Sequence, residues 1–161
     1  MDKYLWRGIV AIPLAKLAFI YALLIVASVW VLEIGFGYLP CPLCLWQRWP
    51  WYGILLACLC ARIVPVRIFG RALLLLFAGS AGVSLFHSGV EMGWWAGLDS
   101  CTSGDFPLSL ERFQESLSQA KPIVRCDQPA LLVLGLSLSD GNLIASLSGF
   151  VYVLFHLGKK A

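Results

Sequence analysis

Three long uncharged stretches constrain what this 161-residue chain can fold into. Residues 17–32, 72–90 and 141–158 contain 16, 19 and 18 residues without a charged side chain. A helix needs roughly 20 apolar residues to cross a bilayer, so each stretch is close to the length of one span. Charged residues make up 13% of the chain, whereas soluble domains average about 25%. The sequence therefore predicts an integral membrane protein with one compact domain.

A fourth span is less obvious, because only 13 residues separate Arg48 from Arg62. A helix that crosses here begins near Leu43 and ends near Val64, which puts Arg48 in its first turns. An ionisable residue inside a span is costly and usually functional, but a long side chain can also extend its charge to the interface. Position alone leaves both interpretations of Arg48 open. The predicted spans are about 14–34, 43–64, 71–90 and 141–158.

The basic residues predict the orientation of these spans. Eight of them fall in the N-terminal segment, the connection between spans two and three, and the C-terminus: Lys3, Arg7, Lys16, Arg62, Arg67, Arg71, Lys159 and Lys160. Such residues gather on the cytoplasmic side, so both termini are expected there. The first apolar stretch lacks a convincing small-x-small cleavage site, so we interpret it as a span and not as a signal peptide.

The fold class expected from this layout is an all-α, four-helix membrane bundle with outer loops over about 35–42 and 91–140. In the long loop, apolar residues recur at three- and four-residue steps between Pro107 and Pro122; they are Leu110, Phe113, Leu117 and Ala120, and Phe106 precedes them. This stripe predicts a short amphipathic helix on the outer membrane surface. Packing of the stripe on the loop's own residues is the alternative.

Two of the six cysteines lie deep in the second predicted span. At 1.5 Å per residue, Cys58 is roughly 21 Å along the helix from Cys44. A loop thiol reaches that depth only if the span unwinds. Cys58 and Cys60 are therefore interpreted as small apolar side chains.

The other four cysteines face the oxidising side of the membrane, where disulfides form and persist. A structural disulfide between Cys101 and Cys126 would close a long loop and could stabilise it by roughly 3 kcal/mol. Cys41 and Cys44 form a C-x-x-C pair, which closes too small a ring to stabilise much. Such pairs occur where a disulfide is made and broken.

Arg48 strengthens the interpretation of Cys44 as a reactive residue. Four residues separate the two, so on a helix their side chains share one face. A guanidinium at this position favours the thiolate and can donate hydrogen bonds to a carbonyl oxygen at the membrane edge. Zinc is the competing explanation for four cysteines, but their spacing does not give two C-x-x-C knuckles. No metal is therefore expected.

Three segments resemble the disulfide bond formation protein B family, DsbB. The run CPLCLWQR at 41–48 resembles the family's active site. FHSGVEMGWW at 86–95 is similar to the entry into its second outer loop, and LGLSL at 134–138 resembles the exit from that loop. The resemblance covers nearly the whole chain, and its most specific part is the layout of two cysteine pairs with Arg48.

The resemblance implies a protein thiol:quinone oxidoreductase of the bacterial inner membrane whose site faces the periplasm. A reduced DsbA-type partner of thioredoxin-like fold attacks a Cys101–Cys126 disulfide at Cys101, and Cys126 then attacks Cys41. Cys44 is left as a thiolate beside Arg48 and meets ubiquinone, or menaquinone when oxygen is scarce. Exchange of this kind requires a thiolate at every step. The lipid bilayer is a further partner, and no nucleic acid is expected.

His87 matches a family position near the quinone pocket, so Arg48 and His87 are the quinone-binding residues that the resemblance implies. An interfacial histidine that bonds only to backbone or water is the alternative for His87. Glu91 is a plausible loop anchor, to which the sequence assigns no chemistry.

Two other functions compete with this one. A reductant exporter moves electrons outward from the cytoplasm and needs a reactive pair deep in the membrane, for which Cys58 and Cys60 are the candidates. A four-span structural or receptor protein with a disulfide-stapled outer loop predicts that Cys41 and Cys44 are dispensable.

Overall fold

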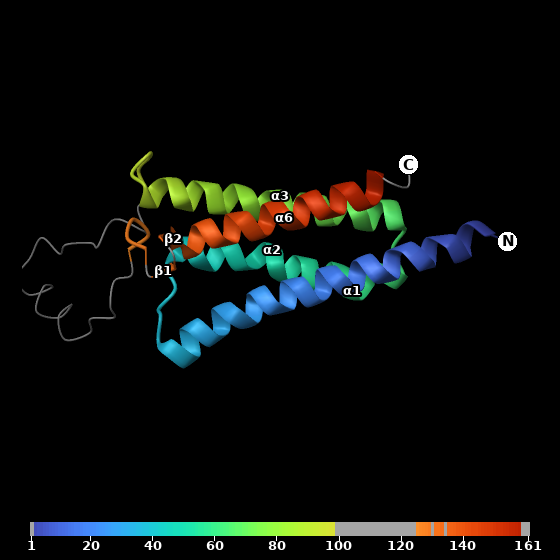
Figure 1. Ribbon diagram of the computed structural model, residues 1–161, viewed down its shortest axis with the longest axis horizontal. Coiled ribbons are helices and arrows are strands. Elements are labelled where there is room, and N and C mark those ends of the chain that lie inside the picture. The colour runs from blue at the N-terminus through green and yellow to red at the C-terminus, as the bar shows by residue number, and fades with distance from the viewer. Residues whose placement is uncertain (1, 99–124, 130, 134, 159–161) are drawn as a thin grey trace, which may run out of the picture.

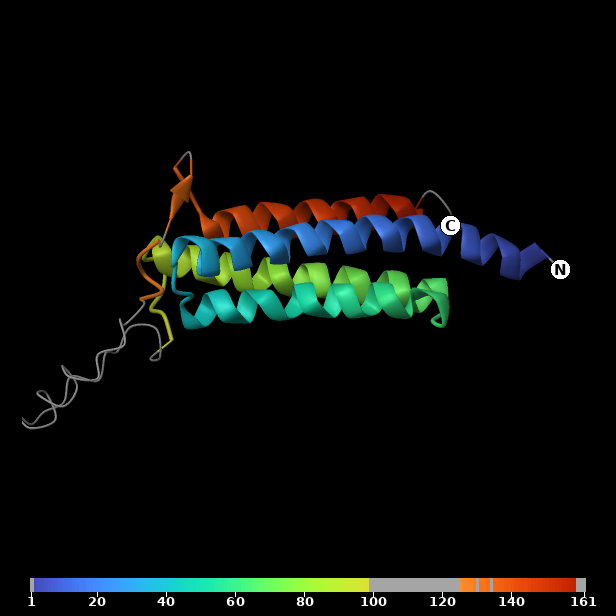
Figure 2. The same cartoon turned by 90° about the horizontal axis from the view of Figure 1, so that it is seen from below.

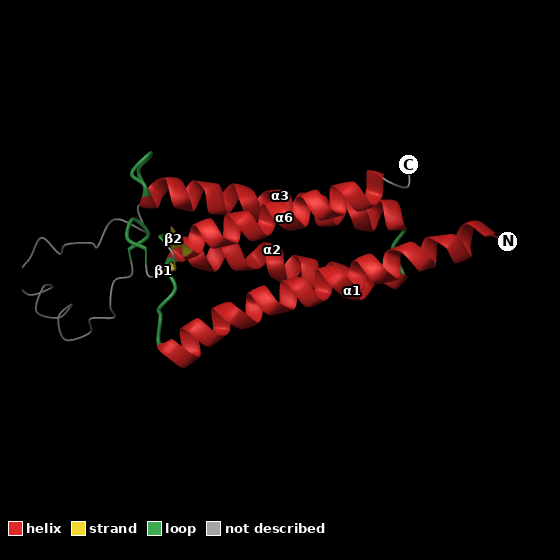
Figure 3. Ribbon diagram, viewed as in Figure 1, coloured by secondary structure: helices red, strands yellow, loops and turns green. Residues whose placement is uncertain are grey.

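The computed structural model describes residues 2–98, 125–129, 131–133 and 135–158. In this part of the chain, helices make up nearly all of the regular structure (Figure 3). Cys101 and the amphipathic helix expected between Pro107 and Pro122 lie outside the described residues.

The long helices of the described residues, α1, α2, α3 and α6, run side by side (Figure 1). The first helix, α1 (Asp2–Trp30), continues into a π-helical turn, η1 (Val31–Gly35). The second, α2 (Pro42–Leu59), ends in a 3-10 turn, η2 (Cys60–Arg62), and is followed by α3 (Val66–Glu91). The last, α6, covers Leu138–Gly158.

A short hairpin before α6 is the one β element among the described residues. Strand β1 (Leu132–Val133) pairs antiparallel with β2 (Leu136–Ser137), and Leu132 lies opposite Ser137. Gly135 in the turn has φ +82, a value that L side chains rarely adopt. The all-α expectation therefore holds apart from this hairpin.

Three described helices are long and apolar enough to cross a membrane, over Ile12–Gly35, Val66–Glu91 and Leu138–Gly158. Many large apolar side chains on the outside of the bundle are exposed; they include Leu24, Leu56, Leu75 and Phe155. A surface of this kind suits lipid and not water. The chain is therefore a helical membrane protein, and α2 is the long helix that these criteria do not include.

Helix α3 begins earlier than its apolar stretch suggested. Pro65 precedes its first turn, and that turn contains Arg67. Proline suits a helix start because the first amide groups have no partner within the helix. The uncharged stretch marks the part of α3 that can lie in lipid, whereas the helix itself extends beyond that stretch toward water.

Small residues let the helices approach closely. The most extensive packing joins α3 to α6, and α2 packs on both α1 and α3. A Cβ added to Gly149 of α6 would lie 2.3 Å from the Phe77 ring of α3, so the contact depends on glycine. Trp51 of α2 is buried and donates through Nε1 to Asn142 of α6 at 2.8 Å. Close packing and interhelical hydrogen bonds are the main forces between helices in lipid.

The bundle has two distinct ends. The start of α1 and the end of α6 lie at one end, and β1 and β2 lie at the other (Figure 1). Figure 2 shows the same separation from below. Helix α1 diverges from α2 toward the hairpin end, where the chain passes from η1 to α2 (Figure 1).

Candidate active site

Cys41 and Cys44 lie at the N-terminus of α2, at the hairpin end of the bundle. Cys41 is the N-cap residue, and its sulfur accepts a hydrogen bond from the backbone N–H of Cys44 at 3.1 Å. The two Sγ atoms are 2.6 Å apart and hydrogen-bonded, and both residues are free thiols. Pro42 occupies the first turn, where its missing N–H leaves nothing unsatisfied. A helix N-terminus favours negative charge, so this position suits a thiolate.

His87 of α3 lies against Cys41. Its Nε2 is 3.6 Å from Cys41 Sγ and 3.5 Å from Glu91 Oε1. On the other side of the ring, Gln47 Nε2 of α2 is 3.0 Å from Nδ1. Cys41 and His87 are each only 3% exposed. The imidazole therefore joins a thiol, an amide and a carboxylate in a buried site.

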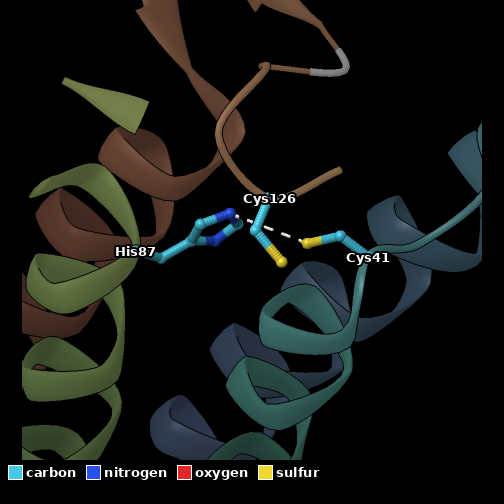
Figure 4. A group of neighbouring side chains, drawn as sticks. All are labelled: Cys41, His87 and Cys126. Atoms are coloured by element: carbon cyan, nitrogen blue, oxygen red, sulfur yellow. Dashed lines mark hydrogen bonds between the residues drawn. The ribbon is translucent and has the colours of Figure 1, made fainter. Parts of the chain in front are cut away.

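Cys126, which belongs to the long loop, lies beside Cys41 and His87. It is fully buried and disulfide-bonded. Its sulfur, the Cys41 sulfur and a ring nitrogen of His87 all lie within 4.8 Å of one another. Figure 4 shows the Cys41 and Cys126 side chains pointing toward each other. Metal binding requires deprotonated thiols, and a disulfide sulfur is not one, so the group is suited to thiol exchange.

A cavity of about 470 Å³ opens beside Cys44, between α1, α2 and the start of α6. Its walls are mainly apolar, and the polar residues among them are Ser28, Glu33, Tyr38, Cys44, Gln47, Arg48, Ser137 and Asn142. Cys44 and Arg48, which are four residues apart on α2, thus line the same cavity. His87 is not among the lining residues, because it lies on the Cys41 side of the pair.

The Arg48 side chain has a partner that the sequence did not reveal. Its Nη1 donates to Glu33 Oε2 of η1 at 2.6 Å, and its guanidinium lies 5.9 Å from the ring centroid of Trp30. Both charged side chains are largely buried, at 12% and 28% exposure. Glu33 therefore neutralises part of the Arg48 charge that lies near Cys44. Arg48 Nε is buried without a hydrogen-bond partner among the described residues.

The surroundings of Cys41 stabilise its thiolate. The hydrogen bond to Cys44 lowers the pKa of Cys41 most, and the nearby His87 lowers it further, to about 5 from an ordinary 9.0. Burial acts in the opposite direction, because it disfavours the charged form. These contacts therefore favour the thiolate form of Cys41.

Cys58 and Cys60 are free thiols at the far end of α2. Cys58 lines a second cavity together with Lys16 and Arg62, away from the hairpin end. The structure thus brings Cys41, Cys44 and Cys126 together with His87 and leaves the deep cysteines apart.

These features define a class, the helical membrane proteins that carry a thiol–disulfide centre at one end of the bundle. The sequence model of the family described as disulfide bond formation protein DsbB matches residues 12–156, so the chain belongs to the DsbB family. Members of this family are generally oxidoreductases.

A relative in Rickettsia prowazekii (strain Madrid E) is 27% identical over 157 residues, which cover 94% of this chain and 87% of the relative. That protein is described as uncharacterized, so it adds no function. No solved structure matches the chain significantly.

The sequence analysis assigned no chemistry to three residues of the site, Glu33, Gln47 and Glu91. Signals for two of them exist in retrospect. Glu91 follows His87 by four residues on one helix face, and Gln47 follows Cys44 by three. Glu33 gave no local signal, because it belongs to a different helix from Arg48.

Proposed function

We propose that this chain is a protein thiol:quinone oxidoreductase of the bacterial inner membrane. It reoxidises a periplasmic DsbA-type thiol oxidase and passes two electrons to ubiquinone or menaquinone. The observation that carries the proposal is the position of Cys126, whose sulfur lies within 4.8 Å of Cys41 Sγ while Cys44 lines an apolar cavity. Membership of the DsbB family gives the proposal its reaction class.

In the proposed route, electrons move from the loop cysteines to the α2 cysteines by two exchanges. A partner thiolate attacks Cys101 and forms a mixed disulfide, and Cys126 leaves with the bonding electron pair. The partner's second thiolate attacks the mixed disulfide, so that the oxidised partner is released and Cys101 leaves as a thiolate. Cys126 then attacks Cys41, so that a Cys41–Cys126 bond forms and the Cys41–Cys44 bond breaks. Cys44 leaves as the thiolate that faces the cavity. The short separation of the Cys41 and Cys126 sulfurs supports the second exchange.

The cavity has features that suit a quinone. Its apolar walls suit the ring and the tail, and Arg48 Nε is a buried donor without a partner among the described residues. Buried donors nearly always have an acceptor, and a quinone carbonyl oxygen would supply one. Arg48 would therefore hold the head group beside Cys44, with Trp51 in the wall. A quinone supplies an acceptor for two electrons and two protons.

The proposed topology places the site on the periplasmic side. Helix α2 is the fourth span in this arrangement. Arg62 and Arg67 lie in or just after the turn between α2 and α3, at the same end of the bundle as the start of α1. Basic residues at that end support a cytoplasmic position for it and for both termini. The hairpin end and its cysteines would then face the periplasm.

The experiment is a coupled assay with the full-length protein in detergent or vesicles, a reduced DsbA-type partner and ubiquinone. Quinol formation is followed by absorbance. We expect steady turnover that Cys44→Ser abolishes, because electrons then have no thiolate at the cavity. Cys58→Ser is the matched control on the same helix and is expected to leave turnover unchanged.

Two results would contradict the proposal. Unchanged turnover in Cys44→Ser would remove Cys44 from the route, and turnover that depends on Cys58 would favour a reductant exporter. A protein inactive toward quinone in every form, with a disulfide-stapled loop, would be a structural or receptor protein.

A further inference from the structure

We propose that His87 is a catalytic residue of the thiol chemistry, which donates its Nε2–H to the Cys41 sulfur and makes Cys41 the thiolate of the reduced pair. Gln47 and Glu91 are positioning residues for this imidazole. The use of the Cys41 thiolate in disulfide exchange rests on the proposed function, whereas the claim that His87 favours ionisation of Cys41 does not. His87 thus acts on the Cys41 sulfur and not on the quinone.

The proton on the imidazole is located by its neighbour in α2. Gln47 Nε2, which can only donate, lies 3.0 Å from His87 Nδ1. Nδ1 of the neutral ring must therefore accept, and the ring proton is on Nε2. Nε2 is the nitrogen that lies 3.6 Å from Cys41 Sγ.

The same N–H has a second acceptor. Glu91 Oε1 is 3.5 Å from His87 Nε2, and the other carboxylate oxygen, Oε2, accepts from Ser139 Oγ at 2.5 Å. Ser139 is in turn hydrogen-bonded to Ser88 and Ser137. Glu91 is thus held by α6 and lies on the α3 side of the ring. When the Cys41 sulfur is bridged and cannot be an anion, the N–H can turn to Glu91 and stay satisfied.

Two N–H groups lie against the Cys41 sulfur in the reduced pair, the backbone N–H of Cys44 at 3.1 Å and His87 Nε2–H. The Cys44 sulfur is 2.6 Å away and accepts from the Cys41 thiol, and it becomes a third donor when Cys41 is ionised. An ionised sulfur only accepts, so all three bonds form together when Cys41 carries the charge. Cys44 has no comparable set, because the Arg48 guanidinium beside it is bonded to Glu33.

Other titratable or loop groups also face this site. Glu91 is on the helix of His87, Cys44 is on α2, and Asp140 acts on the imidazole from the start of α6. Cys126 faces the imidazole from the loop, with its sulfur within 4.8 Å of a ring nitrogen.

The chemistry needs Cys41 as a thiolate twice. When the Cys41–Cys126 bond breaks under attack by Cys101 on Cys126, Cys41 leaves with the electron pair and the Cys101–Cys126 bond re-forms. When the Cys41–Cys44 bond re-forms, two electrons leave the pair for the acceptor and Cys41 must enter without its proton. A lower thiolate pKa speeds departure of the sulfur. In both steps, the hydrogen bond from His87 Nε2–H stabilises the Cys41 thiolate.

A titration of Cys41 in the reduced full-length protein tests this inference without quinone or partner. Thiolate absorbance in the ultraviolet is measured against pH and corrected with the Cys41→Ser protein. In His87→Gln, an amide N–H replaces Nε2–H near the sulfur, whereas the shorter His87→Asn amide reaches only the Nδ1 position. We expect His87→Asn to raise the pKa of Cys41 by about one unit, the equivalent of one charge-assisted hydrogen bond. We expect His87→Gln to retain most of the wild-type value.

His156→Asn is the matched control, since His156 is the other histidine of the chain and lies near the end of α6. It should titrate like wild type. Equal pKa values of Cys41 in all three variants would overturn the inference, and an equal rise in both His87 variants would overturn donation by an N–H.

A measurement on the wild-type chain covers the case in which a His87 variant does not fold. Nitrogen NMR of histidine-labelled reduced protein, assigned with His156→Asn, reports which ring nitrogen of His87 carries the proton. We expect the Nε2–H form, and an Nδ1–H form would overturn the inference. A Cys41 pKa that depends on His87 in a protein without quinol turnover would reject the proposed function and leave this inference standing.

Discussion

At the residue scale, two opposite charges line the cavity beside Cys44. Glu33 and Arg48 lie 15 positions apart in sequence and meet at 2.6 Å, with most of each side chain buried. Removing one partner of such a pair leaves a charge poorly solvated. The pair therefore fixes the guanidinium at the cavity wall, with Nη1 on the carboxylate and Nε without a partner among the described residues.

Arg48→Ala should weaken the use of quinone more than the use of the protein partner. A hydrogen bond from a charged donor contributes about 1.5–3 kcal/mol, which corresponds to roughly a ten- to hundredfold loss in kcat/KM for quinone. Steady-state kinetics with each substrate varied in turn measures this, and Arg67→Ala at the other end of the bundle is the control. A loss confined to the partner's KM would contradict a quinone role for Arg48.

Cys41 also makes the stability of the reduced protein depend on pH. Its pKa is lowered to about 5 in the folded protein from an ordinary 9.0. A lowered pKa contributes stability that is fully present above the unfolded value and is lost as pH falls through the folded value. The Tm advantage of the reduced wild type over Cys41→Ser should therefore shrink steadily from pH 9 to pH 5, as measured by thermal unfolding in detergent. A Tm advantage of the wild type that grows toward acid pH would contradict a lowered pKa of Cys41.

The cysteine pattern and Arg48 could be predicted from the sequence because both depend on short spacings along one helix. Partner choice between helices could not. Glu33 ends one apolar span and Arg48 begins the next, and nothing in either segment says that they meet. The contact of His87 with Cys41 likewise depends on how α3 faces α2, which sequence spacing does not encode.

At the element scale, the apolar stretches located three helices, and the physical reason is length. A run of 16–19 uncharged residues is long for a helix buried in a small soluble domain and suits a bilayer. The exact helix starts depend on capping, so α3 begins at Val66 after Pro65 and α6 begins at Leu138. The β hairpin was missed because strands of two residues show no alternation.

The contact between α3 and α6 gives a prediction about packing. Gly149→Ala places a Cβ 2.3 Å from the Phe77 ring, which must move within a tight interface. Overpacking of this kind costs about 1–3 kcal/mol. Unfolding in mixed detergent should show the loss.

Gly79→Ala is the matched control, because an added Cβ there meets nothing within 4 Å. It should be neutral or slightly stabilising, since alanine favours helix more than glycine. Equal unfolding free energies for the two variants would mean that α3 and α6 do not pack as described.

At the scale of the whole molecule, the bundle separates its chemistry from its termini. The start of α1 and the end of α6 lie at one end of the bundle, and the start of α2 lies at the other (Figure 1). Cys41 and Cys44 are at that start of α2, and Cys126 lies beside Cys41 (Figure 4). The count of basic residues predicted this separation but not the cavity, which depends on the divergence of α1 from α2.

Fusion reporters test the proposed orientation. Green fluorescent protein fused after the C-terminus should fluoresce, and alkaline phosphatase fused there should be inactive, because the proposed topology places that basic end in the cytoplasm. Alkaline phosphatase inserted after Leu98 should be active. An active C-terminal phosphatase fusion would reverse the topology and put the cysteines on the reducing side.

The central claim is that Cys126 exchanges a disulfide with Cys41 beside a cavity lined by Cys44. Disulfide mapping of the Cys101→Ser protein, isolated without reductant and alkylated in acid, tests it most directly. Without Cys101, Cys126 still has the Cys41 sulfur within 4.8 Å. The account predicts a Cys41–Cys126 peptide as the main product, with Cys44 alkylated. An intact Cys41–Cys44 disulfide beside an alkylated Cys126 would contradict it.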